Sequence, residues 1–319
     1  MYSFWILSSA WGNPIVNGVE EEGFPSVLAL GVEFNGYAFS ACTGNLITPR
    51  IILTAAHCGD EYPLEAVLQL GSAFVATEVI DFEAKLSLED AIIHPEYRKI
   101  GSLGPYDVGA YDFGLIQLAE DAPVAPTLFR SLPITEEHEG IAMKSVGFGI
   151  TGHNRNDGGT KRSADLILSE VSSLFLEIQN GDNADDANIC SGDSGGPMFH
   201  YDEEAEQYVQ WAVHSWGDVY CLSESGSTRT DIVSEWIFDY IEEVHGSRDI
   251  CEVNGLYEDG VCTELSACLQ EDPECIVPEE PKGACSSAPI EMLGLSFLGG
   301  LVGLFRRQTK NSNTTGRET

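Results

Sequence analysis

Positively charged residues are scarce in this chain of 319 residues, which has 16 Lys and Arg against 51 Asp and Glu and a formal net charge of −35. Nucleic acids and anionic membranes would repel such a chain, so binding to either through charge is excluded as its main function. We interpret the excess of carboxylates as the solvated acidic surface of a secreted or salt-exposed protein.

Motifs for cofactors and metals are also missing. The sequence has no internal repeat, and the glycines of GFGITG at 147–152 lack the flanking strand and helix of a nucleotide-binding loop. It has no DxDxDG calcium loop, and its cysteines lack the paired CxxC spacing of common zinc sites. We therefore expect neither a metal nor an organic cofactor.

Two short motifs carry the chemistry, GDSGGP at 192–197 and TAAHC at 54–58. A serine hydroxyl is a weak nucleophile at neutral pH, so Ser194 needs a base and a set of donors for the oxyanion that forms on the attacked carbonyl. The flanking glycines can adopt backbone angles closed to other residues, so the amides around Ser194 can turn toward one point. We assign the oxyanion hole to the N–H groups of Gly192 and Ser194.

His57 is the candidate base, because an imidazole changes charge near neutral pH. A third group must orient the imidazole. Asp112 is the candidate, since it directly precedes the apolar run 113–118, where an unpaired carboxylate would be costly. The competing Asp107 precedes no apolar strand, and we interpret it as a loop or strand-cap carboxylate.

With these motifs in the order His, Asp, Ser, the chain resembles the trypsin-like, chymotrypsin-fold serine endopeptidases over residues 15–245. The matching motifs are IVNG at 15–18, CTGNLITPRIILTAAHC at 42–58, DFGLIQL at 112–118, GFGITG at 147–152 and SWG at 215–217. The resemblance implies two six-stranded antiparallel β-barrels, with the active site in the cleft between them and a closing C-terminal helix. It also implies hydrolysis of protein or peptide substrates through an acyl-enzyme, without a cofactor.

The spacing of apolar residues independently predicts an all-β fold. Short apolar or alternating runs are separated by Gly, Pro, Asn and Asp; they lie at 27–32, 51–58, 66–70, 113–118, 142–147 and 208–213. Only residues 231–244 have helical spacing, with a common apolar face; its members are Ile232, Trp236, Ile237, Tyr240, Ile241 and Val244.

The resemblance also places residues of the substrate-binding region. Asn188 stands at the floor of the primary specificity pocket, so a full countercharge for Lys or Arg is missing there. Ser215, Trp216 and Gly217 match the strand that binds the substrate backbone, and Gly217 and Gly226 match small residues that keep the pocket walls open. We predict cleavage after uncharged residues rather than strict cleavage after Arg or Lys.

Activation is implied by the same resemblance. Cleavage before Ile15 would create an ammonium group that pairs with the buried Asp193 and so shapes the oxyanion hole. A buried carboxylate without its partner is unfavourable by several kcal/mol. Because Pro14 precedes the cleavage point, we expect a different protease to act as the activator rather than self-activation by tryptic cleavage.

Features of an exported protein surround the catalytic motifs. Cys42 with Cys58, and Cys190 with Cys221, match two disulfides common in the family, which implies an oxidising compartment; free buried thiols are the weaker alternative. Residues 1–14 contain a short apolar stretch followed by small residues. We interpret them as the remnant of a secretory signal or pro-segment.

The chain changes character after residue 247. Residues 248–285 are rich in acidic residues, and we predict a separate module or stalk in which four cysteines form two disulfides in one of three pairings; they are Cys251, Cys262, Cys268 and Cys275, with Cys285 left over. Residues 288–305 are apolar except for Glu291 and end at two arginines. This order resembles the C-terminal sorting tails of exported bacterial proteins, so 286–319 is predicted to be a sorting or anchor tail recognised by processing machinery. A packed terminal helix is the alternative.

These predictions divide the chain into 1–14, a protease domain at 15–247 that splits near residue 130, a module at 248–285 and a tail at 286–319. The favoured function is an exported, secreted or surface-attached serine endopeptidase. The alternative is a protease-like binding or adhesion protein without turnover. The set of His57, Asp112 and Ser194 favours the enzyme, because a binding module has no physical need for all three.

Overall fold

The computed structural model describes residues 15–257, apart from 61, 104–105, 181–185 and 204, together with residues 268 and 270. The predictions for 1–14, for Cys262, Cys275 and Cys285 and for the tail at 286–319 lie outside the described residues. In the part of the chain that the structure describes, no helix is both long and apolar enough to cross a membrane.

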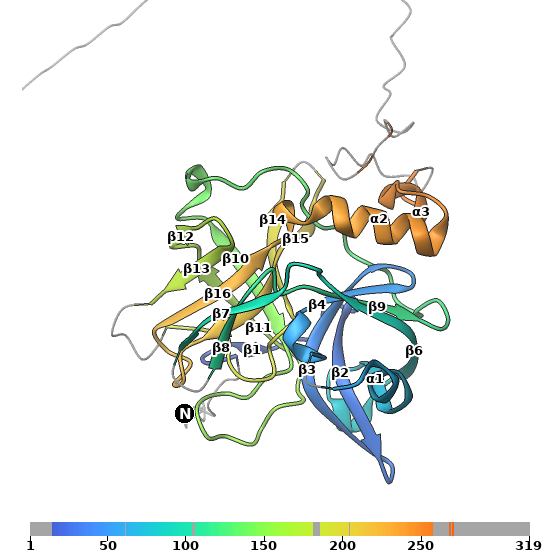
Figure 1. The fold of residues 1–319 in the computed structure, drawn as a ribbon. Helices are drawn as coiled ribbons and strands as arrows, with labels where there is room; N and C mark the ends of the chain where they lie inside the picture. Colours follow the sequence, from blue (N-terminus) through green and yellow to red (C-terminus); the bar gives the residue numbers. More distant parts are fainter. Residues whose placement is uncertain are drawn as a thin grey trace, which may run out of the picture. The chain divides into compact units, whose positions relative to one another are not determined.

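Antiparallel strands dominate the structure, and the first set closes into a six-stranded barrel (Figure 1). The barrel order is β2-β3-β4-β9-β6-β5. Its strands are β2 (Val27–Phe34), β3 (Tyr37–Thr48), β4 (Ile51–Thr54), β5 (Gly71–Val75), β6 (Ala84–Ile93) and β9 (Gly114–Leu118). A two-stranded hairpin between β6 and β9 consists of β7 (Arg98–Leu103) and β8 (Tyr106–Ala110).

The second half forms an eight-stranded sheet rather than the expected second six-stranded barrel. Its order is β1-β11-β10-β14-β15-β16-β13-β12. The strands are β1 (Val19–Glu20), β10 (Ala142–Gly147), β11 (Arg162–Ile167), β12 (Glu170–Val171), β13 (Phe175–Gln179), β14 (Pro197–Asp202), β15 (Gln207–Gly217) and β16 (Glu224–Arg229). The outermost strands β1 and β12 have only two residues each, which leaves little backbone with which the two edges could pair.

One predicted strand is a helix instead. The run at 66–70 lies in α1 (Leu64–Leu70), directly after Pro63. The strand prediction was wrong because the apolar content of LEAVLQL was weighed above its intrinsic preference. Leu, Glu, Ala and Gln are good helix formers, and proline is tolerated where a helix begins.

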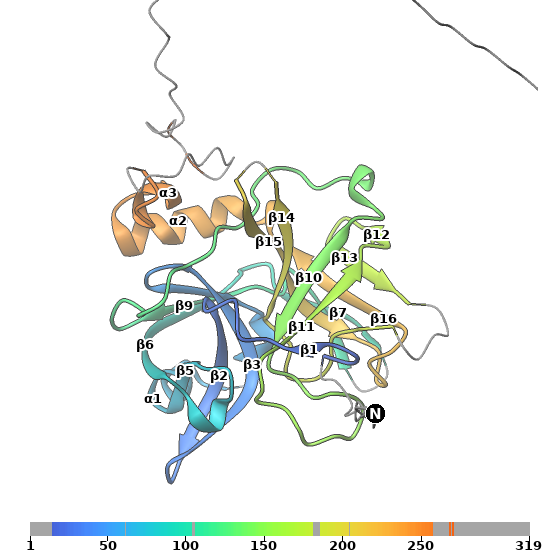
Figure 2. The same cartoon turned by 180° about the vertical axis from the view of Figure 1, so that it is seen from behind.

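The helix expected near the end of the protease domain is α2 (Ser234–His245), which follows a 3₁₀ helix at Thr230–Ile232 and ends at Gly246. Gly246 has φ 75°, the left-handed conformation common after helix ends. The buried face of α2 packs with outward-facing barrel residues such as Leu53 and Leu115 in one core cluster. Figure 2 shows α2 above the barrel from the opposite side, and the other 3₁₀ helices are Ala56–Cys58, Val79–Asp81 and Glu136–His138.

Packing continues past residue 247, where a separate module was expected to begin. Ile250 and Cys251, in the short helix α3 (Ile250–Val253), are fully buried in the same core cluster as α2. Asn254 Nδ2 donates to the carbonyl of Ile47 at 2.9 Å, and Cys251 forms a disulfide with Cys268. The beginning of the predicted stalk is therefore packed into the protease core, and one disulfide of the predicted module joins Cys251 to Cys268.

Candidate active site

Neighbouring barrel strands bring His57 and Asp112 together. His57 follows β4 and Asp112 precedes β9, and these strands pair with Thr54 opposite Gly114. His57 Nδ1 lies 2.7 Å from Asp112 Oδ2, and the His57 backbone N–H donates to Asp112 Oδ1 at 3.0 Å. Because a carboxylate only accepts, Nδ1 carries the proton and Nε2 is left as the basic nitrogen.

Burial and a second donor fix Asp112. Its side chain is 1% exposed, and Ser215 Oγ donates to Oδ2 at 2.6 Å. Burial lowers the pKa of His57, but the hydrogen bond to Asp112 and the negative charge of Asp112 outweigh it, so the pKa of His57 is raised above its ordinary 6.5. The competing carboxylate, Asp107, lies in β8 and forms an ion pair with Lys99.

Ser194 and His57 line one cleft of about 410 Å³, which the barrel borders on one side and the eight-stranded sheet on the other. Cys58 Sγ, next to the histidine, lies 3.6 Å from the carbonyl oxygen of Ser194. Among the described residues, Ser194 Oγ forms no hydrogen bond to the imidazole. The following Gly195 has φ 81°, and a Cβ there would lie 2.1 Å from Thr54 Oγ1, so only glycine fits.

Thr43 on β3 anchors the serine loop to the barrel, a role that the sequence analysis missed. Its N–H donates to the carbonyl of Ser194 at 2.8 Å, and its Oγ1 donates to the carbonyl of Gly192 at 2.9 Å and accepts from the Phe148 N–H at 3.1 Å. These bonds hold the backbone of the serine loop in place. The N–H groups of Gly192 and Ser194 have no acceptor among the described residues. The sequence offers no specific signal for this role, because β3 also contains the polar residues Ser40, Asn45 and Thr48.

Asp193 is fully buried beside the serine. Its Oδ1 accepts from the Gly149 N–H and its Oδ2 from the Cys190 N–H, both at 2.8 Å. Burial raises the pKa of Asp193 to about 7, although both amides and the charge of Arg162 act to lower it. Ile15 is also fully buried, but the structure shows no hydrogen bond between it and Asp193 in this uncleaved chain.

The predicted primary pocket is altered at one wall. Asn188 is fully buried, and its Oδ1 accepts from Ser225 Oγ at 2.6 Å. Gly226 pairs with Trp216, and a Cβ on Gly226 would lie 2.3 Å from the indole, so the missing side chain makes room for the Trp216 ring. The register of β15 is irregular between His214 and Trp216, and this shift places Ser225, not Gly226, opposite Gly217.

Two disulfides hold the walls of the cleft. Cys42 is bonded to Cys58 next to the histidine, and Cys190 is bonded to Cys221 next to the serine loop. All four cysteines line the cleft. Trp216 and Gly217 line it as well, so the structure gathers the predicted substrate-binding strand and the three polar groups in one place.

Comparisons with known proteins agree with this arrangement. The family described as Trypsin matches residues 15–237. The chain is 29% identical over 229 residues to CLIP domain-containing serine protease B10 of Anopheles gambiae, covering 61% of this chain and 60% of that protein. It is 27% identical over 219 residues to human Kallikrein-10, covering 65% and 74%, and 29% identical over 206 residues to the Chymase of Rattus norvegicus, covering 60% and 78%.

The matched region contains every motif that the cleft brings together, from Ile15 to the beginning of α2. Most of the described residues fall within it. The chain therefore belongs to the trypsin family of serine endopeptidases.

Proposed function

We propose that this chain is an exported serine endopeptidase that hydrolyses peptide bonds through an acyl-enzyme on Ser194. The observation that carries the proposal is the imidazole of His57, held by the buried Asp112 in the same cleft as Ser194. His57 and Asp112 adjoin strands of the barrel, whereas Ser194 lies just before β14 of the eight-stranded sheet. A protein that only binds would have no use for an oriented base in the same cleft as a serine hydroxyl.

In this mechanism His57 Nε2 removes the proton of Ser194 Oγ as the oxygen attacks the scissile carbonyl, and then donates it to the leaving amine. Asp112 stabilises the imidazolium and keeps the proton on Nδ1. The N–H groups of Gly192 and Ser194 stabilise the oxyanion, a contribution typically worth about 3 kcal/mol per donor. Activity should rise with pH as His57 loses its proton, with a midpoint above 6.5.

The same proposal includes cleavage after uncharged residues. Asn188 brings no charge to the pocket floor, and Ser225 adds a hydroxyl where an open wall was predicted. Cleavage before Ile15 by another protease would supply the ammonium that Asp193 lacks. Three disulfides favour an oxidising compartment. Attachment through the tail at 286–319 remains part of the proposal.

Covalent labelling tests the proposed function. A serine-directed phosphonate should label the chain cleaved before Ile15 and should not label its Ser194→Ala variant. Equal labelling of both, or labelling of neither, would contradict the proposal and favour the binding or adhesion alternative.

A further inference from the structure

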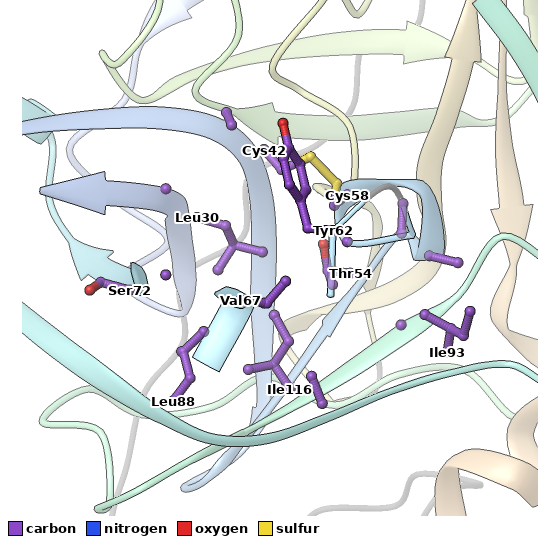
Figure 3. Close-up of a pocket in the computed structure, with 18 of the residues that line it drawn as sticks. Leu30, Cys42, Thr54, Cys58, Tyr62, Val67, Ser72, Leu88, Ile93 and Ile116 are labelled. Atoms are coloured by element: carbon purple, nitrogen blue, oxygen red, sulfur yellow. A yellow bond between two sulfur atoms is a disulfide. The ribbon is translucent and has the colours of Figure 1, made fainter. Parts of the chain in front are cut away.

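An apolar cavity of about 370 Å³ lies between the short helix α1 and one end of the barrel. Figure 3 shows Leu30, Val67, Leu88 and Ile116 gathered around one space, with the Cys42–Cys58 disulfide at its upper end. Among the residues that the structure describes, no charged side chain lines the cavity. Its Thr54 hydroxyl already donates to the carbonyl of Thr43, so the cavity suits an apolar group and offers little to a polar one.

The cavity exists because α1 covers the barrel without filling it. None of the seven residues of α1 is buried, and Leu70 is 68% exposed. The helix presents Ala66, Val67 and the partly exposed Leu70 to the cavity, and the first two are small. A dry apolar cavity of about 150 Å³ is enough to bind benzene, so this larger one has room for an aromatic or branched aliphatic side chain.

The cavity adjoins the catalytic cleft, because four residues form a shared wall. Ala41, Cys42, Cys58 and Tyr62 line both. Tyr62 is 66% exposed and stands beside the disulfide in Figure 3, at the boundary between the two spaces. A group that passes Tyr62 from the cleft would therefore meet the apolar side chains of the cavity.

The position of this boundary identifies which part of a substrate would enter. The acyl side of the substrate lies along Ser215–Gly217 in the proposed function, on the eight-stranded sheet. The leaving-group side must then extend over the opposite wall, which the Cys42–Cys58 disulfide and Tyr62 form. An apolar side chain at that end of the substrate is the occupant closest to the mouth of the cavity.

We infer that the cavity under α1 binds a bulky apolar side chain, such as Leu or Phe, from the leaving-group side of the substrate. This inference rests on the proposed function. It makes α1 a determinant of specificity, separate from the primary pocket at Asn188. Substrates with an apolar residue just after the scissile bond should be hydrolysed more efficiently than substrates with Ala or Glu there.

Two kinds of substrate test the inference. Internally quenched peptides share one acyl side and carry Ala, Leu, Phe or Glu at the first or second leaving-group residue, and a peptidyl p-nitroanilide has no residue on that side. For the wild-type chain cleaved before Ile15, kcat/KM should be at least about tenfold higher with Leu or Phe than with Ala. In Ala66→Phe, which fills the cavity, this ratio should fall below about twofold while p-nitroanilide hydrolysis stays within about twofold of wild type.

Glu65→Phe is the matched control, because it adds the same ring to an exposed position of α1 that does not line the cavity. It should keep the wild-type preference. Val67→Phe fills the same cavity from the next residue and should lose the preference, which protects the test against misfolding of a single variant. A wild-type preference below twofold, or a preference retained in both filled variants, would overturn the inference. Wild-type failure to cleave even the p-nitroanilide would instead overturn the proposed function, and the inference with it.

Discussion

The reactivity of His57 depends most directly on the carboxylate of Asp112. We predict that Asp112→Asn lowers kcat/KM by about four orders of magnitude, because an amide can present an N–H to Nδ1 and leave the proton on the wrong nitrogen. Hydrolysis of a p-nitroanilide measures the loss. Asp107→Asn is the control, since Asp107 borders the cleft but pairs with Lys99, and it should stay within about threefold of wild type. Equal losses in both variants would argue against the assignment of Asp112.

The identity of residue 188 should set the charge preference of the primary pocket. We predict that Asn188→Asp raises the ratio of kcat/KM for Arg over Leu at the cleaved residue by at least about tenfold, a change of about 1.4 kcal/mol. The substitution replaces the amide nitrogen with oxygen, so the side chain becomes a negatively charged carboxylate. Its Oδ1 would still accept the hydrogen bond from Ser225 Oγ. Ser225→Ala adds no charge and should not raise the ratio. A peptide library reports both ratios, and a wild-type preference for Arg or Lys would refute the premise.

At the residue scale, local motifs point to the polar groups, whereas the register of paired strands lies beyond what a local motif can predict. His57, Asp112 and Ser194 stand in short strings whose chemistry can be argued from the sequence. That Ser225 rather than Gly226 lies opposite Gly217 could not be predicted in this way. An irregularity in the register of β15 decides which residue of β16 pairs with Gly217. A glycine was counted as an open wall, although its missing side chain makes room for the Trp216 ring.

At the scale of elements, β3 positions the serine loop through Thr43. We predict that Thr43→Val lowers kcat by about tenfold with little change in KM, because it leaves the carbonyl of Gly192 and the N–H of Phe148 without their buried partner. Thr43→Ser keeps the hydroxyl and should restore kcat. Steady-state kinetics on a p-nitroanilide separates the two parameters. A change confined to KM would show that Thr43 does not hold the oxyanion hole.

The pattern of apolar residues predicts an element well where that element buries a continuous run or one face. The strands at 27–32 and 142–147 contain short runs that are buried continuously, and the closing helix has the helical spacing of its buried face. The segment at 66–70 did not follow this rule, because no residue of α1 is buried and helix preference decides its structure. The edges of the second sheet depend on two-residue strands, which carry no recognisable pattern.

At the scale of the whole molecule, the buried Asp193, which has no ion-pair partner among the described residues, makes stability depend on pH and on cleavage before Ile15. In the uncleaved chain the pKa of Asp193 is about 7 in the folded state, against an ordinary 3.8. Between these values the folded state holds a proton that the unfolded state has lost, so the free energy of unfolding falls as pH rises from about 4 to 7. This contribution should amount to at most about 4 kcal/mol.

Denaturant unfolding across this pH range measures the effect against the many other carboxylates of the chain. The uncleaved Asp193→Asn variant should lack this contribution, and so should the cleaved wild-type chain, in which an ammonium can pair with the carboxylate. Identical pH slopes for the uncleaved wild type and Asp193→Asn would contradict the role of Asp193.

The extent of the protease domain was another whole-molecule property that composition could not reveal. The acidic, cysteine-containing sequence after 247 suggested a stalk, yet Ile250 and Cys251 are buried with α2 and Asn254 bonds to β3. Long-range packing of two apolar side chains outweighed the local change in composition. The excess negative charge, by contrast, belongs to the exterior and says little about the fold.

The formation of an acyl-enzyme on Ser194 is the most direct test of the account. The chain cleaved before Ile15 is mixed rapidly with a p-nitrophenyl ester of a blocked, uncharged amino acid, and the quenched protein is analysed by peptide mass spectrometry. We predict a burst of about one equivalent of p-nitrophenol and an acyl group on Ser194, both absent from Ser194→Ala. No burst, or an acyl group on a residue other than Ser194, would contradict the account.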